Sequence, residues 1–200
     1  IVFTAMADGT FMFSEDGTND PNGVNGMERG TYTWNPATGA FISTVQTDTN
    51  REWGLSDDGP VTVTVTGNTL VATVRNGDQF TFTRVVDTNG PVEPIVGAWR
   101  FDDTDGPGSL VVLTLFENGS FVLVQDESLP TSDGTERGTY SVAPNGDVTF
   151  TRILDTSPTA GLFSAEDPGP VVLNIVVSGD TLTLNDGEEI FRGTRIRAPQ

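Results

Sequence analysis

The stretch Glu28-Arg29-Gly30-Thr31-Tyr32 (ERGTY) occurs twice in this chain, the second time at residues 136–140. The sequence before it repeats as well, because residues 1–13 (IVFTAMADGTFMF) align with residues 111–123 (VVLTLFENGSFVL). A repeat of this length predicts two copies of one structural unit, and the 200 residues divide into two domains of ordinary size.

The alignment also sets the expected domain boundaries. We expect one domain at residues 1–86, a second at residues 96–200, and a linker at residues 87–95 (DTNGPVEPI), which holds two prolines and a glycine. The second copy opens with residues 96–101 (VGAWRF), and the first copy has no counterpart of this segment.

Short runs in which apolar residues alternate with Thr predict β-strands along the whole chain, as in residues 61–65 (VTVTV). Asx-Gly pairs between the runs favour tight hairpin turns, and no run of ten or more residues has a helical period. The first copy holds seven strand candidates, from residues 1–6 to residues 79–86. The second copy holds eight, at residues 96–101, 110–116, 120–126, 138–143, 147–154, 171–177, 180–184 and 189–197.

Eight strands joined mostly by short turns close naturally into an antiparallel barrel. We therefore predict an all-β fold of two tandem antiparallel up-and-down barrels, of which the first lacks its first strand.

The composition excludes several kinds of chemistry. There is no Cys and no His, and all ten basic residues are Arg, so thiolate, imidazole and Schiff-base chemistry are absent. The formal net charge of −18 repels phosphate backbones, so we expect no nucleic-acid partner. No stretch of 18 apolar residues occurs, so we expect no transmembrane segment.

The motif Gly97-Ala98-Trp99 on the first predicted strand of the second copy, with an Arg on the last, resembles the calycin superfamily of lipocalins and their bacterial lipocalin-like relatives. Arg195 is the best match for this Arg, and Arg192 is the second choice. The resemblance implies that the Trp closes one barrel end and that the Arg packs across its indole. A guanidinium stacked on an indole contributes about 0.5–2 kcal/mol in any fold. Arg84 is the counterpart of Arg195 in the first copy, which has no Trp for its absent first strand.

The absent strand has three explanations at this point. It lies upstream of Ile1 in a longer chain, since the sequence begins without Met and reads as a mature or trimmed fragment. Alternatively, the barrel closes with seven strands, or a neighbouring subunit supplies a strand and the protein polymerises. In the last case the acceptor edge consists of Ile1, Val2, Phe3, Thr4, Ala5 and Met6.

Two further groups of residues are candidates for binding sites. A small hydrophobic ligand could be held in the first barrel by Tyr32, Trp34, Phe41 and Trp53. Closely spaced acidic residues in two loops offer oxygen ligands for calcium, although neither loop has the EF-hand spacing. These residues are Asp102, Asp103 and Asp105 in one loop and Asp16 and Asp20 in the other.

Together these features favour a non-enzymatic extracellular module, secreted or displayed on a cell surface, with a structural or adhesive role. A filament or matrix subunit that associates with itself or with another extracellular protein fits this description. The alternative is a lipocalin-like carrier of a small hydrophobic ligand, and a third reading is a calcium-stabilised adhesin segment. The recurring pairs Glu28-Arg29 and Glu136-Arg137 are interpreted as structural, with the two side chains on opposite faces of a sheet.

Overall fold

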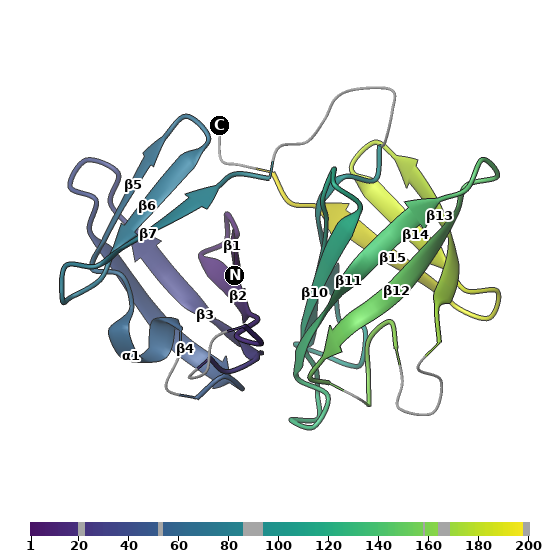
Figure 1. Ribbon diagram of the computed structural model, residues 1–200, viewed down its shortest axis with the longest axis horizontal. Helices are drawn as coiled ribbons and strands as arrows, with labels where there is room; N and C mark the ends of the chain where they lie inside the picture. The colour runs from purple at the N-terminus through teal and green to yellow at the C-terminus, as the bar shows by residue number, and fades with distance from the viewer. Residues whose placement is uncertain (20–22, 52–53, 86–93, 158, 164–168, 198–200) are drawn as a thin grey trace. The chain divides into compact units, whose positions relative to one another are not determined.

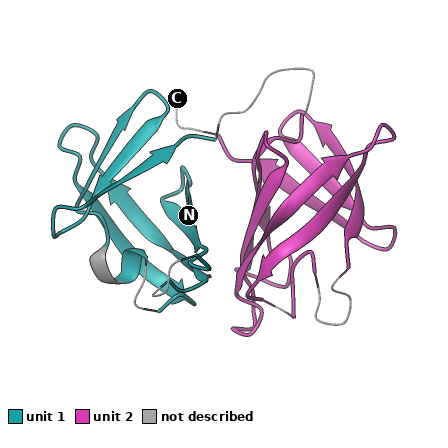
Figure 2. Cartoon of the chain, viewed as in Figure 1, with its two compact units in different colours: residues 1–86, 198–200 teal, residues 87–197 magenta. Residues whose placement is uncertain are grey.

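Antiparallel β-strands form nearly all the regular structure in the computed structural model, which describes residues 1–19, 23–51, 54–85, 94–157, 159–163 and 169–197 (Figure 1). The chain divides into unit 1, residues 1–86 with 198–200, and unit 2, residues 87–197 (Figure 2). The prediction of an all-β fold is confirmed, and the described residues include a single short helix.

Unit 2 is a closed antiparallel barrel of eight strands. Each strand pairs with its neighbours in sequence, and the last strand pairs with the first to close the ring. The sequence prediction of an eight-stranded barrel for the second copy is therefore confirmed. The strands are β8 (Gly97–Asp102), β9 (Leu110–Leu115), β10 (Ser120–Asp126), β11 (Gly134–Val142), β12 (Asp147–Asp155), β13 (Val171–Ser178), β14 (Thr181–Asn185) and β15 (Ile190–Arg195).

Aromatic side chains fill the interior of this barrel. Trp99 and Phe150 have no exposed surface, and Phe121 packs edge-on against Phe150 with 5.2 Å between ring centroids. Phe163, from the long connection after β12, stacks on Phe121. The inward residues of successive strands and two residues outside the strands, Ile95 and Phe163, therefore form a single continuous core.

Unit 1 has seven strands in two open sheets. One sheet contains β1 (Val2–Ala5), β2 (Thr10–Glu15), β3 (Gly26–Trp34) and β4 (Phe41–Asp48), and the other contains β5 (Thr62–Thr66), β6 (Thr69–Thr73) and β7 (Gln79–Thr83). The short helix α1 (Leu55–Asp58) precedes β5, and the single bridge between Ala40 and Thr62 joins the two sheets.

Within the described residues unit 1 does not form a closed barrel, so the prediction of two tandem barrels is not confirmed, and the alternative of closure by seven strands is not observed. The physical reason is that no described strand lies between β1 and β7, and these two strands do not pair with each other.

Local details show that unit 1 nevertheless follows the same plan as unit 2. A register shift occurs in β3 between Arg29 and Gly30, and in β11 between Arg137 and Gly138. The Tyr32 hydroxyl donates to the Met6 carbonyl across a hairpin, as the Tyr140 hydroxyl does to the Phe116 carbonyl. Unit 1 is therefore an open version of the unit 2 barrel in which one strand position is unfilled among the described residues.

Candidate strand-binding groove

Two of the four edge strands of unit 1, β1 and β7, define the candidate site. β1 pairs with β2 on one side only, and β7 pairs with β6 on one side only, within the part of the chain that the structure describes. In unit 2 the equivalent strands β9 and β15 both pair with β8, which lies between them. The edges of β1 and β7 are therefore equivalent to the edges of β9 and β15 with which β8 pairs in unit 2.

An apolar cavity of about 360 Å³ lies beside these edges and receives side chains from both sheets of unit 1. Its volume falls near the lower end of the range for ligand pockets. Glu15 is among the few polar residues that line it, and its side chain is largely buried. The aromatic part of the lining consists of Phe3, Phe13, Phe41, Phe80 and Phe82.

In unit 2 the equivalent space is filled by the inward face of β8. Trp99 is fully buried, and its indole nitrogen donates to the Ile95 carbonyl over 2.8 Å. The Arg195 guanidinium lies 4.0 Å from the centroid of the indole ring and donates to the carbonyls of Val96 and Pro94. The predicted residues Gly97, Trp99 and Arg195 are thus brought together at the junction of β8 and β15.

Arg84 in unit 1 has the backbone position of Arg195. Its amide donates to the Asn68 carbonyl over 2.7 Å, as the Arg195 amide donates to the Asp180 carbonyl over 2.8 Å. Its side chain is exposed, whereas Arg195 is partly covered by the residues around β8. The backbone of unit 1 therefore places an arginine at the position that Arg195 has beside Trp99 in unit 2.

The residues predicted to line a ligand cavity are only partly placed there. Phe41 lines the cavity, and the Tyr32 ring stacks on the Phe41 ring with 5.6 Å between ring centroids. Trp34 is 37% exposed and donates its indole N–H to the Val63 carbonyl. Trp53 lies outside the described residues. Sequence reasoning placed Phe3 on the acceptor edge and not in the cavity lining, and it missed Phe80 and Phe82, whose alternation along β7 was the available signal.

The acidic residues predicted to bind calcium have separate partners. Asp102 pairs with Arg100, and Asp103 accepts from the Gly108 amide. Asp105 accepts from the Ser128 hydroxyl, whereas Asp16 accepts from the Thr18 amide and Asp20 lies outside the described residues. No group of three or more acidic side chains placed to hold a metal ion occurs within the described ranges, so the calcium prediction gains no support.

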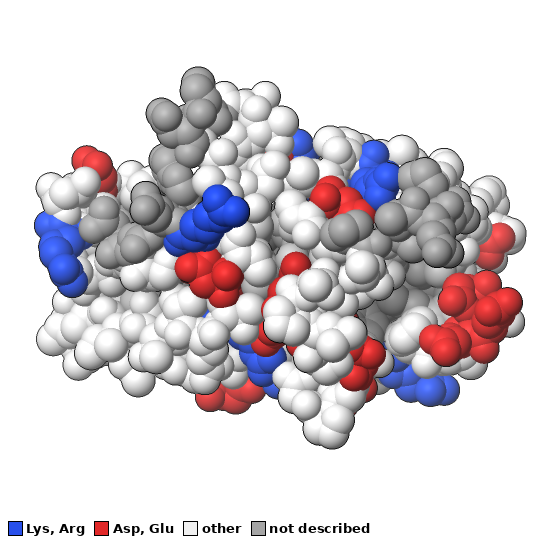
Figure 3. Space-filling view, turned by 90° about the horizontal axis from the view of Figure 1, so that it is seen from below, with Lys and Arg blue, Asp and Glu red and all other residues white. Residues whose placement is uncertain are grey.

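On the face shown in Figure 3, acidic side chains lie in several separate groups. The described residues contain no helix long and apolar enough to span a membrane.

A buried carboxylate anchors the long connection in each unit. In unit 1 the Leu55 and Ser56 amides donate to Glu28, and in unit 2 the Leu162 and Phe163 amides donate to Glu136 over 3.1 and 3.3 Å. Neither carboxylate has exposed surface. These contacts give the repeated ERGTY motif a structural role, since its glutamate replaces the solvent that the loop amides would otherwise bind.

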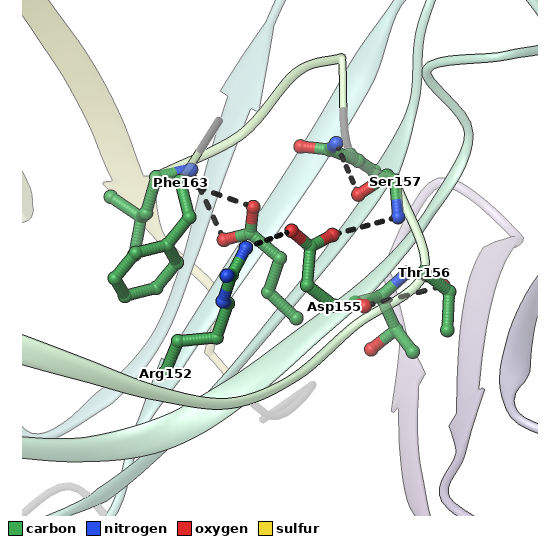
Figure 4. A network of polar contacts seen from close by, with 9 residues as sticks. Arg152, Asp155, Thr156, Ser157 and Phe163 are labelled. Carbon is green, nitrogen blue, oxygen red and sulfur yellow. Dashed lines mark hydrogen bonds and ion pairs between the residues drawn. The ribbon is translucent and has the colours of Figure 1, made fainter. Parts of the chain in front are cut away.

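Burial raises the pKa of Glu136 to about 8, against the opposing effect of the Phe163 and Leu162 amides. The nearby Asp155 raises this pKa further, and Arg152 lowers it. Arg152 donates to Asp155 over 2.8 Å, and Asp155 in turn accepts from the Ser157 amide (Figure 4). The network therefore holds a carboxyl group that prefers its neutral form beside a charged pair.

This pKa predicts that unit 2 loses stability as the pH rises from about 5 to 8. The folded state keeps a proton on Glu136 that the unfolded state, with a pKa near 4.5, has released, so raising the pH favours unfolding. The slope for one group is at most about 1.4 kcal/mol per pH unit. Urea unfolding of Glu136→Gln across this range is expected to show a flatter profile, whereas Glu117→Gln on an exposed turn keeps the slope. An unchanged slope in Glu136→Gln would contradict the assignment.

Comparisons with known proteins leave the chain without a family. No family model matches the chain, and no curated protein matches it. Among solved structures, the lipoprotein YedD from Klebsiella pneumoniae subsp. pneumoniae MGH 78578 is similar to part of it, with 11% identity and a TM-score of 0.35. The match covers 58% of this chain and 82% of that chain. At this TM-score the similarity carries no argument, and the resemblance to the calycin superfamily stays a prediction.

Proposed function

We propose that the chain is a non-enzymatic extracellular module, structural or adhesive, that assembles by accepting a β-strand from a neighbouring polypeptide in unit 1. One observation carries the proposal: β1 and β7 have open edges beside an apolar cavity, at the position that β8 fills in unit 2. Open strand edges pair readily with other chains, and main-chain hydrogen bonds supply much of the affinity.

The accepted strand would complete unit 1 as a second eight-stranded barrel, which gives the two tandem barrels of lipocalin type that the sequence predicts. The added strand would cover the aromatic residues of β1 and β7. Phe80 is 47% exposed and Ile1 is 57% exposed without it, and covering such surfaces is favourable.

The proposed location outside the cell, secreted or on a cell surface, is supported by composition alone. A net charge of −18 favours solubility and disfavours nucleic acid and anionic lipid surfaces as partners. The absence of His, Cys and Lys from the sequence supports a role without catalysis.

Replacing Ala5 by Pro is expected to block strand acceptance. Met6 donates its amide to Thr10 within the hairpin, so by alternation the amide of Ala5 points toward the open edge. Proline removes that donor and places its ring at the edge. Hydrogen exchange should show that a peptide of residues 94–102 protects the amides of β1 and β7 in the unmodified chain.

In Ala5→Pro, peptide affinity should fall by at least about tenfold. The amides of β14 within the closed barrel serve as an internal control, because the peptide should leave their exchange unchanged. Sedimentation over rising concentration completes the test, with association expected for the unmodified chain and reduced in Ala5→Pro. A strict monomer whose edges no peptide protects would contradict the proposed function.

A second candidate function, the binding of a small hydrophobic ligand, is favoured by the aromatic lining of the unit 1 cavity. A native mass spectrum of the purified chain that shows a retained apolar molecule would favour this function. Displacement of that molecule by the strand peptide would show that ligand and strand compete for one groove.

A further inference from the structure

We propose that the groove between β1 and β7 selects one class of strand, in which Gly, Trp and a small residue occupy successive inward-facing positions. This inference rests on the proposed function of unit 1 as a strand acceptor and adds the sequence that the acceptor prefers. The strand would run antiparallel to both edges, as β8 does between β9 and β15.

The pairing registers give the equivalent positions in the two units. Phe82 pairs with Leu70 in unit 1, as Gly193 pairs with Leu182 in unit 2. On the other edge, Phe3 pairs with Phe13, as Leu113 pairs with Leu123. Each position of a strand in the groove therefore corresponds to one residue of β8, and we name the positions by those residues.

The groove is suited to a tryptophan at the place of Trp99. In unit 2 this residue lies opposite Leu113 and beneath the Arg195 guanidinium. Unit 1 presents Phe3 and Arg84 at the two equivalent positions, and Arg84 is exposed. An indole inserted there would have an aromatic neighbour on one side and a cation for its face on the other.

The groove differs from unit 2 at the place of Phe101. A Cβ atom on Gly193 would lie only 2.6 Å from the Phe101 ring, so in unit 2 the glycine makes room for the phenylalanine. Unit 1 has Phe82 at the glycine position, and this ring packs against the buried cluster of Phe41, Val63 and Ala72. Phe82 thus stands at the position where Gly193 makes room for a ring in unit 2, and we expect the accepted strand to need a small residue there.

The first inward position requires glycine. Gly97 begins β8 with a φ of 127°, which other residues rarely adopt. It lies opposite Leu115, whose equivalent in unit 1 is Ala5, since Leu115 pairs with Phe121 as Ala5 pairs with Phe11. The expected pattern is therefore Gly-x-Trp-x-small, in contrast to the Gly-x-Trp-x-Phe of β8.

Labelled peptides of residues 94–102 (PIVGAWRFD) test this pattern in binding titrations with the full chain. The peptide with Phe101→Ala is expected to bind at least about tenfold more tightly than the natural one, because overpacking the groove is costly. The Phe101→Ala peptide that also carries Trp99→Ala is expected to lose binding.

The protein variant Phe82→Gly provides the reciprocal test, since it recreates the situation of Gly193. It is expected to reverse the preference and bind the natural peptide more tightly. If this variant does not fold, the proposal is tested by the unmodified chain alone, through its preference for the Phe101→Ala peptide over the natural peptide. Equal binding of all peptides would overturn the selectivity while leaving strand acceptance intact, and no binding by any peptide would overturn both.

Discussion

Replacing Trp99 by Ala is expected to lower the free energy of unfolding of unit 2 by about 3–5 kcal/mol, the usual cost of removing a large buried aromatic side chain. Trp99 is fully buried, and its loss leaves a cavity where β8 meets β15. The change also leaves the Ile95 carbonyl without its indole donor and the Arg195 guanidinium without the ring it covers.

The experiment compares the urea unfolding of the unmodified chain with that of its variants. Hydrogen exchange in the strands of each unit monitors the unfolding of that unit. Trp34→Ala is the matched control, since Trp34 is 37% exposed and contributes a single indole hydrogen bond to Val63. We expect the control to cost less than about 2 kcal/mol and to affect unit 1 only. A loss of less than about 1 kcal/mol for Trp99→Ala would show that β8 is not held by its tryptophan.

The sequence predicts the strands of unit 2 well because strand formation here depends on local patterns. Alternating apolar residues and Asx-Gly turns mark the same segments that the structure pairs. The clearest difference is β11, which begins at Gly134 rather than at the predicted residue 138. Its first residues include Glu136, a buried acidic side chain that a hydrophobic pattern does not mark as part of a strand.

The alignment of the two copies predicts that unit 1 lacks a strand, but local patterns do not show whether its barrel closes without that strand. Closure depends on a partner for β1 and β7, which are far apart in the sequence, and no local signal reports whether two distant edges meet. The role of Glu28 escapes local reasoning for the same reason, since the amides that it accepts from lie 27 and 28 residues further along.

The residue that distinguishes the unit 1 groove from the same place in unit 2 is nevertheless visible in the sequence. Aligning residues 80–84 (FTFTR) with residues 191–195 (FRGTR) places Phe82 opposite Gly193. Only the structure gives this difference a meaning, because it shows that Gly193 lies against the ring of Phe101.

Supplying the strand covalently is expected to close unit 1. A second copy of residues 94–110, carrying Phe101→Ala, would be placed directly before Ile1. The alignment makes Ile1 equivalent to Val111, so the added segment ends where β1 begins and keeps the connection between β8 and β9. A tethered strand acts at an effective concentration in the millimolar range, far above that of a free peptide.

The closed unit 1 should gain about 3–5 kcal/mol of stability, the contribution typical of one buried tryptophan, and its association with other chains should disappear. The same extension with Trp99→Ala in the added copy is the control and should gain much less. Protection of the β1 and β7 amides from exchange reports closure directly, and added strand peptide should no longer bind. Unchanged stability together with undiminished association would mean that the groove does not bind a β8-like strand. A tethered strand loses less entropy on binding than a free peptide, so it should bind if the groove accepts strands of this kind.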